Sequence, residues 1–258
     1  MSAAESELVS YRVSDDVACL QLNNPPVNIM SAALMQEMSA HLETIAADRD
    51  LKALAVTAAG KAFCAGADVG EHRPDKVQEM IGAFGRLFRQ LDALEIPVVM
   101  AVGGVAMGAG FELILMADVL LASAEAVFGQ PEIRLGFFAP VGVVELPALV
   151  GRAKAMEITC TGRNYSAAEM ARMGLVASVV GADELDGALA GVLKDIRRAS
   201  PLVLRLNTRT LKRSRAGDFA ATLAEAERVF LEELMTSRDP VEGIEAFYAK
   251  RRPEWTNS

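Results

Sequence analysis

The stretch Pro97–Glu112, which reads PVVMAVGGVAMGAGFE, decides how this chain can fold. Its apolar, β-branched run Val98–Val102 predicts a short strand that is buried on both faces. The pair Gly103–Gly104 ends this strand, and a second run of small residues predicts that a helix begins near Gly108. The stretch therefore predicts a strand, a glycine-rich turn and a helix that carries the carboxylate of Glu112.

The wider apolar segment Ile96–Ala122 has the length of a membrane span, but it contains Glu112 and Asp118. A spanning helix would place both carboxylates in lipid, at a cost of about 2.5–3.5 kcal/mol for each. We therefore expect a buried strand and a buried helix here, and no membrane partner.

Strand and helix patterns alternate on both sides of this stretch. The predicted strands are Val9–Val13, Val17–Leu22, Ala53–Thr57, Val98–Val102, Val119–Ala122 and Ala126–Phe128, the first two as a hairpin. The predicted helices are Ala32–Ala47, Val77–Leu94, Asp183–Ala199 and Ala220–Met235, while Ala58–Gly70 reads as a loop. From about Pro147 the pattern is mainly helical, and Ser166–Glu169 predicts a capping box. The chain thus reads as one α/β domain with a helical appendage.

Composition excludes several classes of partner. The chain has 258 residues, of which 52% are hydrophobic, and a net charge of -8. Nucleic acid and anionic membranes need a basic surface, so neither is an expected partner. Three widely spaced cysteines predict a reducing, cytoplasmic setting without a disulfide framework, and Cys64 reads as a buried small residue. The start MSAAESELVS predicts no signal peptide, and no metal-binding motif is found.

A second carboxylate, Glu132, follows a proline in the apolar run Phe128–Glu132. Carboxylates in apolar clefts are common acid and base catalysts, so Glu112 and Glu132 together suggest an active site. The glycine-rich turns Ala65–Asp68 and Gly108–Gly110 could direct backbone amides at one oxyanion, or they could simply be tight turns. A dinucleotide site is disfavoured, because Leu113 replaces the third glycine of the motif and Glu112 would repel a pyrophosphate.

Four segments together carry a resemblance to a known family. They are Lys61–Asp68, Pro97–Glu112, Phe128–Gly136 and Asp239–Arg251. In content and order they resemble the signatures of the crotonase superfamily, also called the enoyl-CoA hydratase/isomerase family. The likeness extends over nearly the whole chain.

The resemblance implies a particular fold and ligand. Residues 1–195 would form a spiral of ββα units that holds the active site, and residues 196–258 a helical trimerisation region. The protein would be a homotrimer or homohexamer that binds an acyl-CoA substrate. It would need no separate cofactor and no metal.

The resemblance also implies roles for individual residues. The amides of Ala67 and Ala109 would form an oxyanion hole, and Glu112 and Glu132 would be the hydratase pair. Glu112 would activate water and Glu132 would protonate the enolate, although the reverse division stays open. The implied CoA-binding residues are Ala65, Gly66, Asp68, Phe247 and Lys250.

The loop Gly129–Pro140 carries a finer resemblance, to cyclohexa-1,5-diene-1-carbonyl-CoA hydratases of anaerobic aromatic degradation. These hydrate a cyclic dienoyl-CoA to 6-hydroxycyclohex-1-ene-1-carbonyl-CoA. The implied acyl-pocket residues are His72, Phe137, Phe138 and Pro140, and His72 could equally be a solvated loop histidine. Two alternatives remain open: a straight-chain enoyl-CoA hydratase of β-oxidation, and a non-catalytic acyl-CoA binding scaffold.

Overall fold

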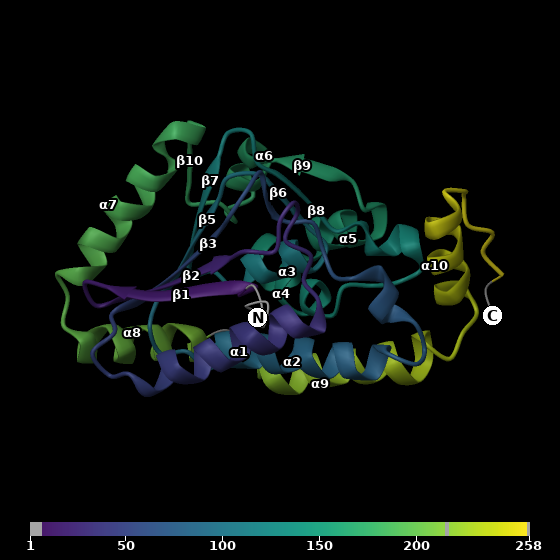
Figure 1. Ribbon diagram of the computed structural model, residues 1–258, viewed down its shortest axis with the longest axis horizontal. Coiled ribbons are helices and arrows are strands. Elements are labelled where there is room, and N and C mark those ends of the chain that lie inside the picture. Colours follow the sequence, from purple (N-terminus) through teal and green to yellow (C-terminus); the bar gives the residue numbers. More distant parts are fainter. Residues whose placement is uncertain (1–6, 215–216, 257–258) are drawn as a thin grey trace, which may run out of the picture.

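Two sheets form the centre of the computed structural model, which describes residues 7–214 and 217–256 (Figure 1). The larger sheet has the order β1-β2-β3-β5-β7-β10, and the smaller sheet has the order β4-β6-β8-β9. The β1–β2 and β8–β9 pairs are antiparallel, and the other neighbours are parallel. The larger sheet consists of β1 Val9–Ser14, β2 Val17–Leu22, β3 Ala53–Ala58, β5 Val98–Val102, β7 Val119–Ser123 and β10 Ser178–Val180. The smaller consists of β4 Ala62–Cys64, β6 Val105–Met107, β8 Val127–Gly129 and β9 Asn164–Ser166.

The chain visits the two sheets in turn and then forms a helix. Strand β3 leads to β4 and helix α2, β5 leads to β6 and α3, and β7 leads to β8 and α4. This repeated order confirms the predicted α/β class and its ββα units. The α-helices are α1 Ala32–Ala47, α2 Val77–Ala93, α3 Ala109–Leu115, α4 Pro140–Val150, α5 Arg152–Thr161, α6 Ala167–Arg172, α7 Leu185–Arg197, α8 Pro201–Ser214, α9 Phe219–Arg228 and α10 Asp239–Ala249.

Four short helical segments complete the described part. The 3-10 helices are η1 Val69–His72, η2 Pro131–Leu135 and η3 Ala182–Glu184, and the π-helix is η4 Val229–Leu234. Segment η2 carries Glu132, and η1 follows the loop that contains Ala67. These segments therefore lie where the sequence places the functional residues.

Several helices and strands differ in bounds or in type from those that the sequence predicts. The predicted loop Ala58–Gly70 contains strand β4 and the start of η1, and strand β6 precedes the helix that was expected near Gly108. The predicted helix Ala220–Met235 is α9 followed by η4, and Asp183–Ala199 is η3 followed by α7. The mainly helical part begins at Pro140, so Pro147 lies inside α4, and this part also contains strands β9 and β10, which were not predicted. Strands of three residues are too short to show an alternating pattern, which explains why they escaped prediction. The capping box of Ser166 and Glu169 is confirmed.

The core lies on both faces of the larger sheet. Helices α1, α2 and α9 lie side by side on one side, and α7 covers the other (Figure 1). Phe219, Leu223 and Phe230 belong to the same buried cluster as the sheet, so the C-terminal helices pack on the core. Helix α7 spans residues 195 and 196, and the domain boundary between them stays a prediction.

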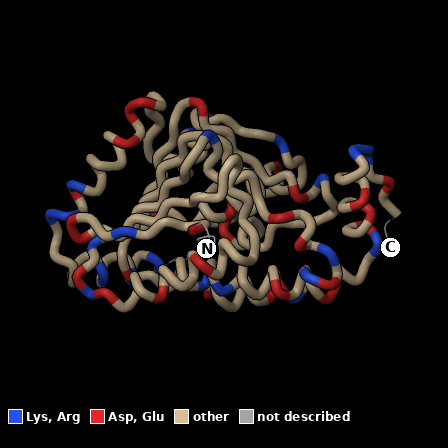
Figure 2. The backbone as a smooth tube through the Cα atoms, viewed as in Figure 1, with Lys and Arg blue, Asp and Glu red and all other residues tan. Residues whose placement is uncertain are grey.

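The surface carries mixed charge. Figure 2 shows Lys and Arg interspersed with Asp and Glu along the outer helices. Within residues 7–214 and 217–256, no helix has the length and apolar character needed to cross a membrane.

Candidate active site

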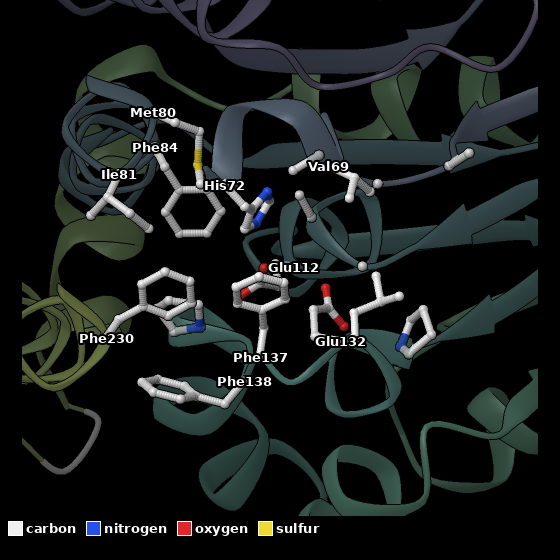
Figure 3. Close-up of a pocket in the computed structure, with 18 of the residues that line it drawn as sticks. Val69, His72, Met80, Ile81, Phe84, Glu112, Glu132, Phe137, Phe138 and Phe230 are labelled. Atoms are coloured by element: carbon white, nitrogen blue, oxygen red, sulfur yellow. The ribbon is translucent and has the colours of Figure 1, made fainter. Parts of the chain in front are cut away.

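A cavity of about 360 Å³ opens between η1, α2, α3, η2 and η4 (Figure 3). It brings together most of the site residues that the sequence predicts. These are Ala65, Gly66, Ala67, His72, Ala109, Glu112, Glu132, Phe137, Phe138, Pro140 and Phe247. Residues from widely separated parts of the chain thus meet at one place.

Helix α3 carries Glu112 into the back of this cavity. The turn before the helix needs Gly108, which has a φ of 54°, a region that strongly favours glycine. A side chain at Gly110 would collide with the backbone of Cys64, so only glycine lets the helix approach the loop after β4. These two glycines therefore set where the Glu112 carboxylate lies.

The Glu112 carboxylate is 2% exposed and is held by the start of α4. Its Oε1 accepts hydrogen bonds from the backbone amides of Val141 at 2.8 Å and Gly142 at 3.1 Å. These donors could not be predicted from the sequence, because they lie in a segment without a polar motif. They fix the carboxylate and leave its second oxygen for other contacts.

The Glu132 carboxylate approaches from η2, whose first residue is Pro131. Its Oε1 accepts a hydrogen bond of 3.0 Å from Nε2 of Gln130, which also donates to the Gly108 carbonyl at 3.3 Å. Its Oε2 is buried and has no hydrogen-bond partner within the described residues. A buried oxygen without a partner is costly, so this oxygen is suited to bind water or substrate.

The two carboxylates cannot both hold a charge at low cost. Burial, and then the charge of Glu132, raise the pKa of Glu112 well above its ordinary value, against the opposing effect of the Val141 and Gly142 amides. Burial raises the pKa of Glu132 to about 7, against the opposing effect of its own backbone amide and of Gln130. The pair therefore retains a proton near neutral pH, which acid and base chemistry requires.

The candidate oxyanion residues, Ala67 and Ala109, both line the cavity. Ala109 is the first residue of α3, so its amide has no carbonyl partner within the helix. The Ala67 loop is fixed by a hydrogen bond of 2.9 Å from the Met30 amide to the Gly66 carbonyl. Both alanines thus belong to fixed backbone at the edge of one cavity.

An aromatic wall closes the cavity. The ring of Phe230, from η4, stacks on Phe137 with a centroid distance of 5.9 Å and meets Phe138 edge-on at 5.4 Å. The imidazole of His72 lies 4.8 Å from the Phe137 ring. Figure 3 shows these rings on the side of the cavity toward Phe84. The rings lie at several angles to one another and form a largely apolar wall of the cavity that holds the carboxylates.

Two predicted CoA-binding residues lie outside the cavity wall. Asp68 Oδ1 accepts a hydrogen bond of 2.7 Å from the Gly70 amide and caps η1, and Lys250 is an exposed residue at the end of α10. Their role in CoA binding stays a prediction. The sequence pattern does not predict that Ile29, Met80, Ile81, Phe84 and Phe230 line the cavity, or that Gln130 contacts Glu132. Among the residues that the structure describes, no group of three or more His, Cys, Asp or Glu is placed to hold a metal ion.

The chain is similar to known proteins over nearly its whole length. Residues 12–258 match the enoyl-CoA hydratase/isomerase family. The cyclohexa-1,5-dienecarbonyl-CoA hydratase of Thauera aromatica is 36% identical over 262 residues, which covers 100% of both chains. The short-chain-enoyl-CoA hydratase of Clostridium acetobutylicum is 33% identical over 92% of this chain and 93% of its own length.

A solved structure gives the same result. The enoyl-CoA hydratase from Mycobacterium avium subsp. paratuberculosis K-10 superposes with a TM-score of 0.87 at 28% identity, covering 96% of this chain and 98% of that chain. These matches confirm the resemblance that the four sequence segments carry, and with it an enzyme of the hydratase type. The chain belongs to the enoyl-CoA hydratase/isomerase family.

Proposed function

We propose that this enzyme adds water to a cyclic α,β-unsaturated acyl-CoA, namely cyclohexa-1,5-diene-1-carbonyl-CoA, and forms 6-hydroxycyclohex-1-ene-1-carbonyl-CoA. The observation that carries the proposal is the position of Glu112 and Glu132, two buried carboxylates in one cavity with an aromatic wall. The 36% identity to the Thauera aromatica enzyme over its full length supports the same substrate.

In the proposed mechanism, the amides of Ala67 and Ala109 bind the thioester carbonyl oxygen. They stabilise the negative charge that develops there when water attacks the alkene, and such donors are each worth about 3–4 kcal/mol in the transition state. The thioester places the alkene carbons between the two glutamates. The half-exposed ring of Phe247 lies at the cavity wall, where it would contact the CoA part.

The two glutamates then divide the proton transfers. Following the family resemblance, Glu112, whose charged form accepts hydrogen bonds from the Val141 and Gly142 amides, takes a proton from the attacking water. The reverse division stays open, because the pKa of Glu112 is raised further than that of Glu132. The hydroxyl bonds to the β carbon, and the alkene electrons move to the carbonyl oxygen to form an enolate. Glu132 in its protonated form returns a proton to a carbon of the enolate. One water is consumed. Glu112 then holds a proton and Glu132 a negative charge, so the transfer of one proton from Glu112 to Glu132 restores the starting state.

The aromatic wall supports a ring over a long chain. Phe137, Phe138 and Phe230 form an aromatic wall of the cavity, against which an apolar ring can pack. A straight-chain enoyl-CoA hydratase of β-oxidation remains the second candidate, because 33% identity to a short-chain-enoyl-CoA hydratase supports it.

The test compares crotonyl-CoA and cyclohexa-1,5-diene-1-carbonyl-CoA side by side, by loss of the alkene-thioester absorbance and by analysis of the product. We expect the ring substrate to have the higher kcat/KM. Glu112→Gln and Glu132→Gln should each lower kcat by about 10²-fold or more, because each removes one proton transfer. Preference for crotonyl-CoA would favour the straight-chain candidate. Binding without turnover of either substrate, or full activity in a glutamine variant, would contradict the proposal.

A further inference from the structure

His72 places a polar group in an otherwise apolar part of the cavity. It ends the short helix η1, and its ring lies 4.8 Å from Phe137 and 6.4 Å from Phe230. Figure 3 shows the imidazole facing the same cavity as Glu112 and Glu132. The proposed water addition uses the two glutamates and leaves His72 without a role.

The surroundings fix which nitrogen of His72 carries the proton. Nδ1 lies 2.9 Å from the carbonyl oxygen of Asp68. A carbonyl can only accept a hydrogen bond, so Nδ1 must donate. Burial lowers the pKa of His72, so the ring is neutral near neutral pH. Nε2 therefore presents a lone pair, and it has no hydrogen-bond partner within the described residues.

Two further hydrogen bonds hold η1, the short helix that carries His72. The Asp68 carboxylate caps η1 through the Gly70 amide at 2.7 Å. The Glu71 carboxylate accepts a hydrogen bond of 2.8 Å from the amide of Ala32 and so ties η1 to the start of α1. A side chain supported in this way is suited to recognise one group of a ligand.

An acyl group that fills the cavity would exclude water from Nε2. A purely apolar group would leave this acceptor buried without a donor, which weakens binding, whereas a hydroxyl would pair with it. In the proposed mechanism the reacting carbons lie at Glu112 and Glu132, which leaves the rest of the acyl group to contact Nε2. A hydroxyl on the far part of a ring meets this condition.

We propose that His72 is a specificity-determining residue, whose Nε2 accepts a hydrogen bond from a hydroxyl on the acyl ring, at a carbon beyond those that react. The inference rests on the proposed acyl-CoA hydratase function and goes beyond its substrate, because the cyclohexa-1,5-diene ring carries no hydroxyl. Among ring-shaped acyl-CoAs, those with a hydroxyl in addition to the reacting positions should bind more tightly than those without one.

Saturated ligands test this without turnover. Cyclohexanecarbonyl-CoA and its 3-hydroxy and 4-hydroxy derivatives cannot be hydrated, and calorimetric titration gives their affinities for the full-length protein. We expect one hydroxy derivative to bind roughly tenfold more tightly than the parent, as is typical of one added neutral hydrogen bond in a buried site. His72→Phe retains a ring but removes the acceptor, so it should abolish this preference. His72→Gln retains an acceptor on a side chain of similar reach and should keep part of it.

The outcomes separate this inference from the proposed function. Equal affinity of the wild type for all three ligands, or an unchanged preference in a folded His72→Phe variant, overturns the role of His72. Melting curves establish that each variant is folded. Hydration of the dienoyl-CoA is assayed on the same wild-type sample. If hydration is absent while the preference persists, the proposed function fails and the role of His72 stands.

Discussion

At the scale of single residues, the burial of Glu132 has a measurable effect on stability. Burial raises its pKa from 4.5 to about 7 in the folded state, so folding favours the protonated form. A group with a raised folded pKa contributes stability that is fully present below its unfolded pKa. That contribution is lost as the pH rises through the folded pKa. The folded protein therefore bears the cost of a buried charge above neutral pH.

Glu132→Gln should remove this dependence, because glutamine has a similar shape and cannot ionise. The free energy of unfolding of Glu132→Gln minus that of wild type should increase by about 2 kcal/mol from about pH 5 to about pH 8. Urea unfolding at several pH values measures it. The control Glu125→Gln changes an exposed turn residue and should follow the wild-type curve. Parallel curves for wild type and Glu132→Gln would contradict the burial of this charge.

At the scale of elements, helix α10 lies very close to η2, the segment that carries Glu132. A Cβ atom at Gly243 would collide with the carbonyl oxygen of Leu135, and one at Gly136 would lie 2.9 Å from the carbonyl oxygen of Asp239. Only glycine allows this approach of two backbones. The position of α10 is therefore linked to that of Glu132 and, through Phe247, to the cavity wall.

Gly243→Ala should separate the two elements. We expect a loss of about 1–3 kcal/mol in the free energy of unfolding, as is typical of overpacking, together with a lower kcat. The matched control is Gly82→Ala on the exposed face of α2, where no heavy atom lies within 4 Å of the new Cβ. That change should stabilise the helix by about 0.5–1 kcal/mol and leave kcat unchanged. Similar effects of the two substitutions would show that the contact with η2 is unimportant.

The elements also show what the sequence could and could not predict. Helix Ala32–Ala47 has the predicted bounds, because Leu34, Met38 and Ile45 repeat at helical spacing and are all buried. Strands β4 and β6 depend on partners distant in the chain, and three residues show no periodicity of their own. Phe230 reads as one apolar position of a helix. The π-helix that brings it to Phe137 has no sequence signal.

The candidate site could likewise be predicted only in part. The resemblance predicted that Glu112 and Glu132 belong together, and the structure brings both to one cavity. The Val141 and Gly142 amides that hold Glu112 could not be predicted, because every residue has an amide and only the fold selects two of them. The Nδ1 contact of His72 also depends on local backbone geometry, which a loop sequence does not specify.

At the scale of the whole molecule, helix α8 has two different faces. Arg205 and Thr208 are buried against the core, while Leu202, Val203 and Leu206 are 65%, 58% and 43% exposed. At 100° per residue, the three apolar side chains fall within one sector of the helix, opposite the buried side. An apolar sector in water favours association. We therefore expect this face to contact another copy of the chain in the homotrimer or homohexamer that the family resemblance implies.

The assembly can be tested with two substitutions on the same helix. Leu206→Glu places a charge in the apolar sector, so we expect it to shift the protein toward smaller species in sedimentation velocity experiments. Leu211→Glu is the control, because Leu211 is also exposed but lies outside that sector. A buried, unpaired charge costs several kcal/mol at an interface, whereas an exposed charge costs little, so only the first change should weaken association. A monomeric wild type, or an equal effect of both substitutions, would exclude this face of α8 as the subunit contact.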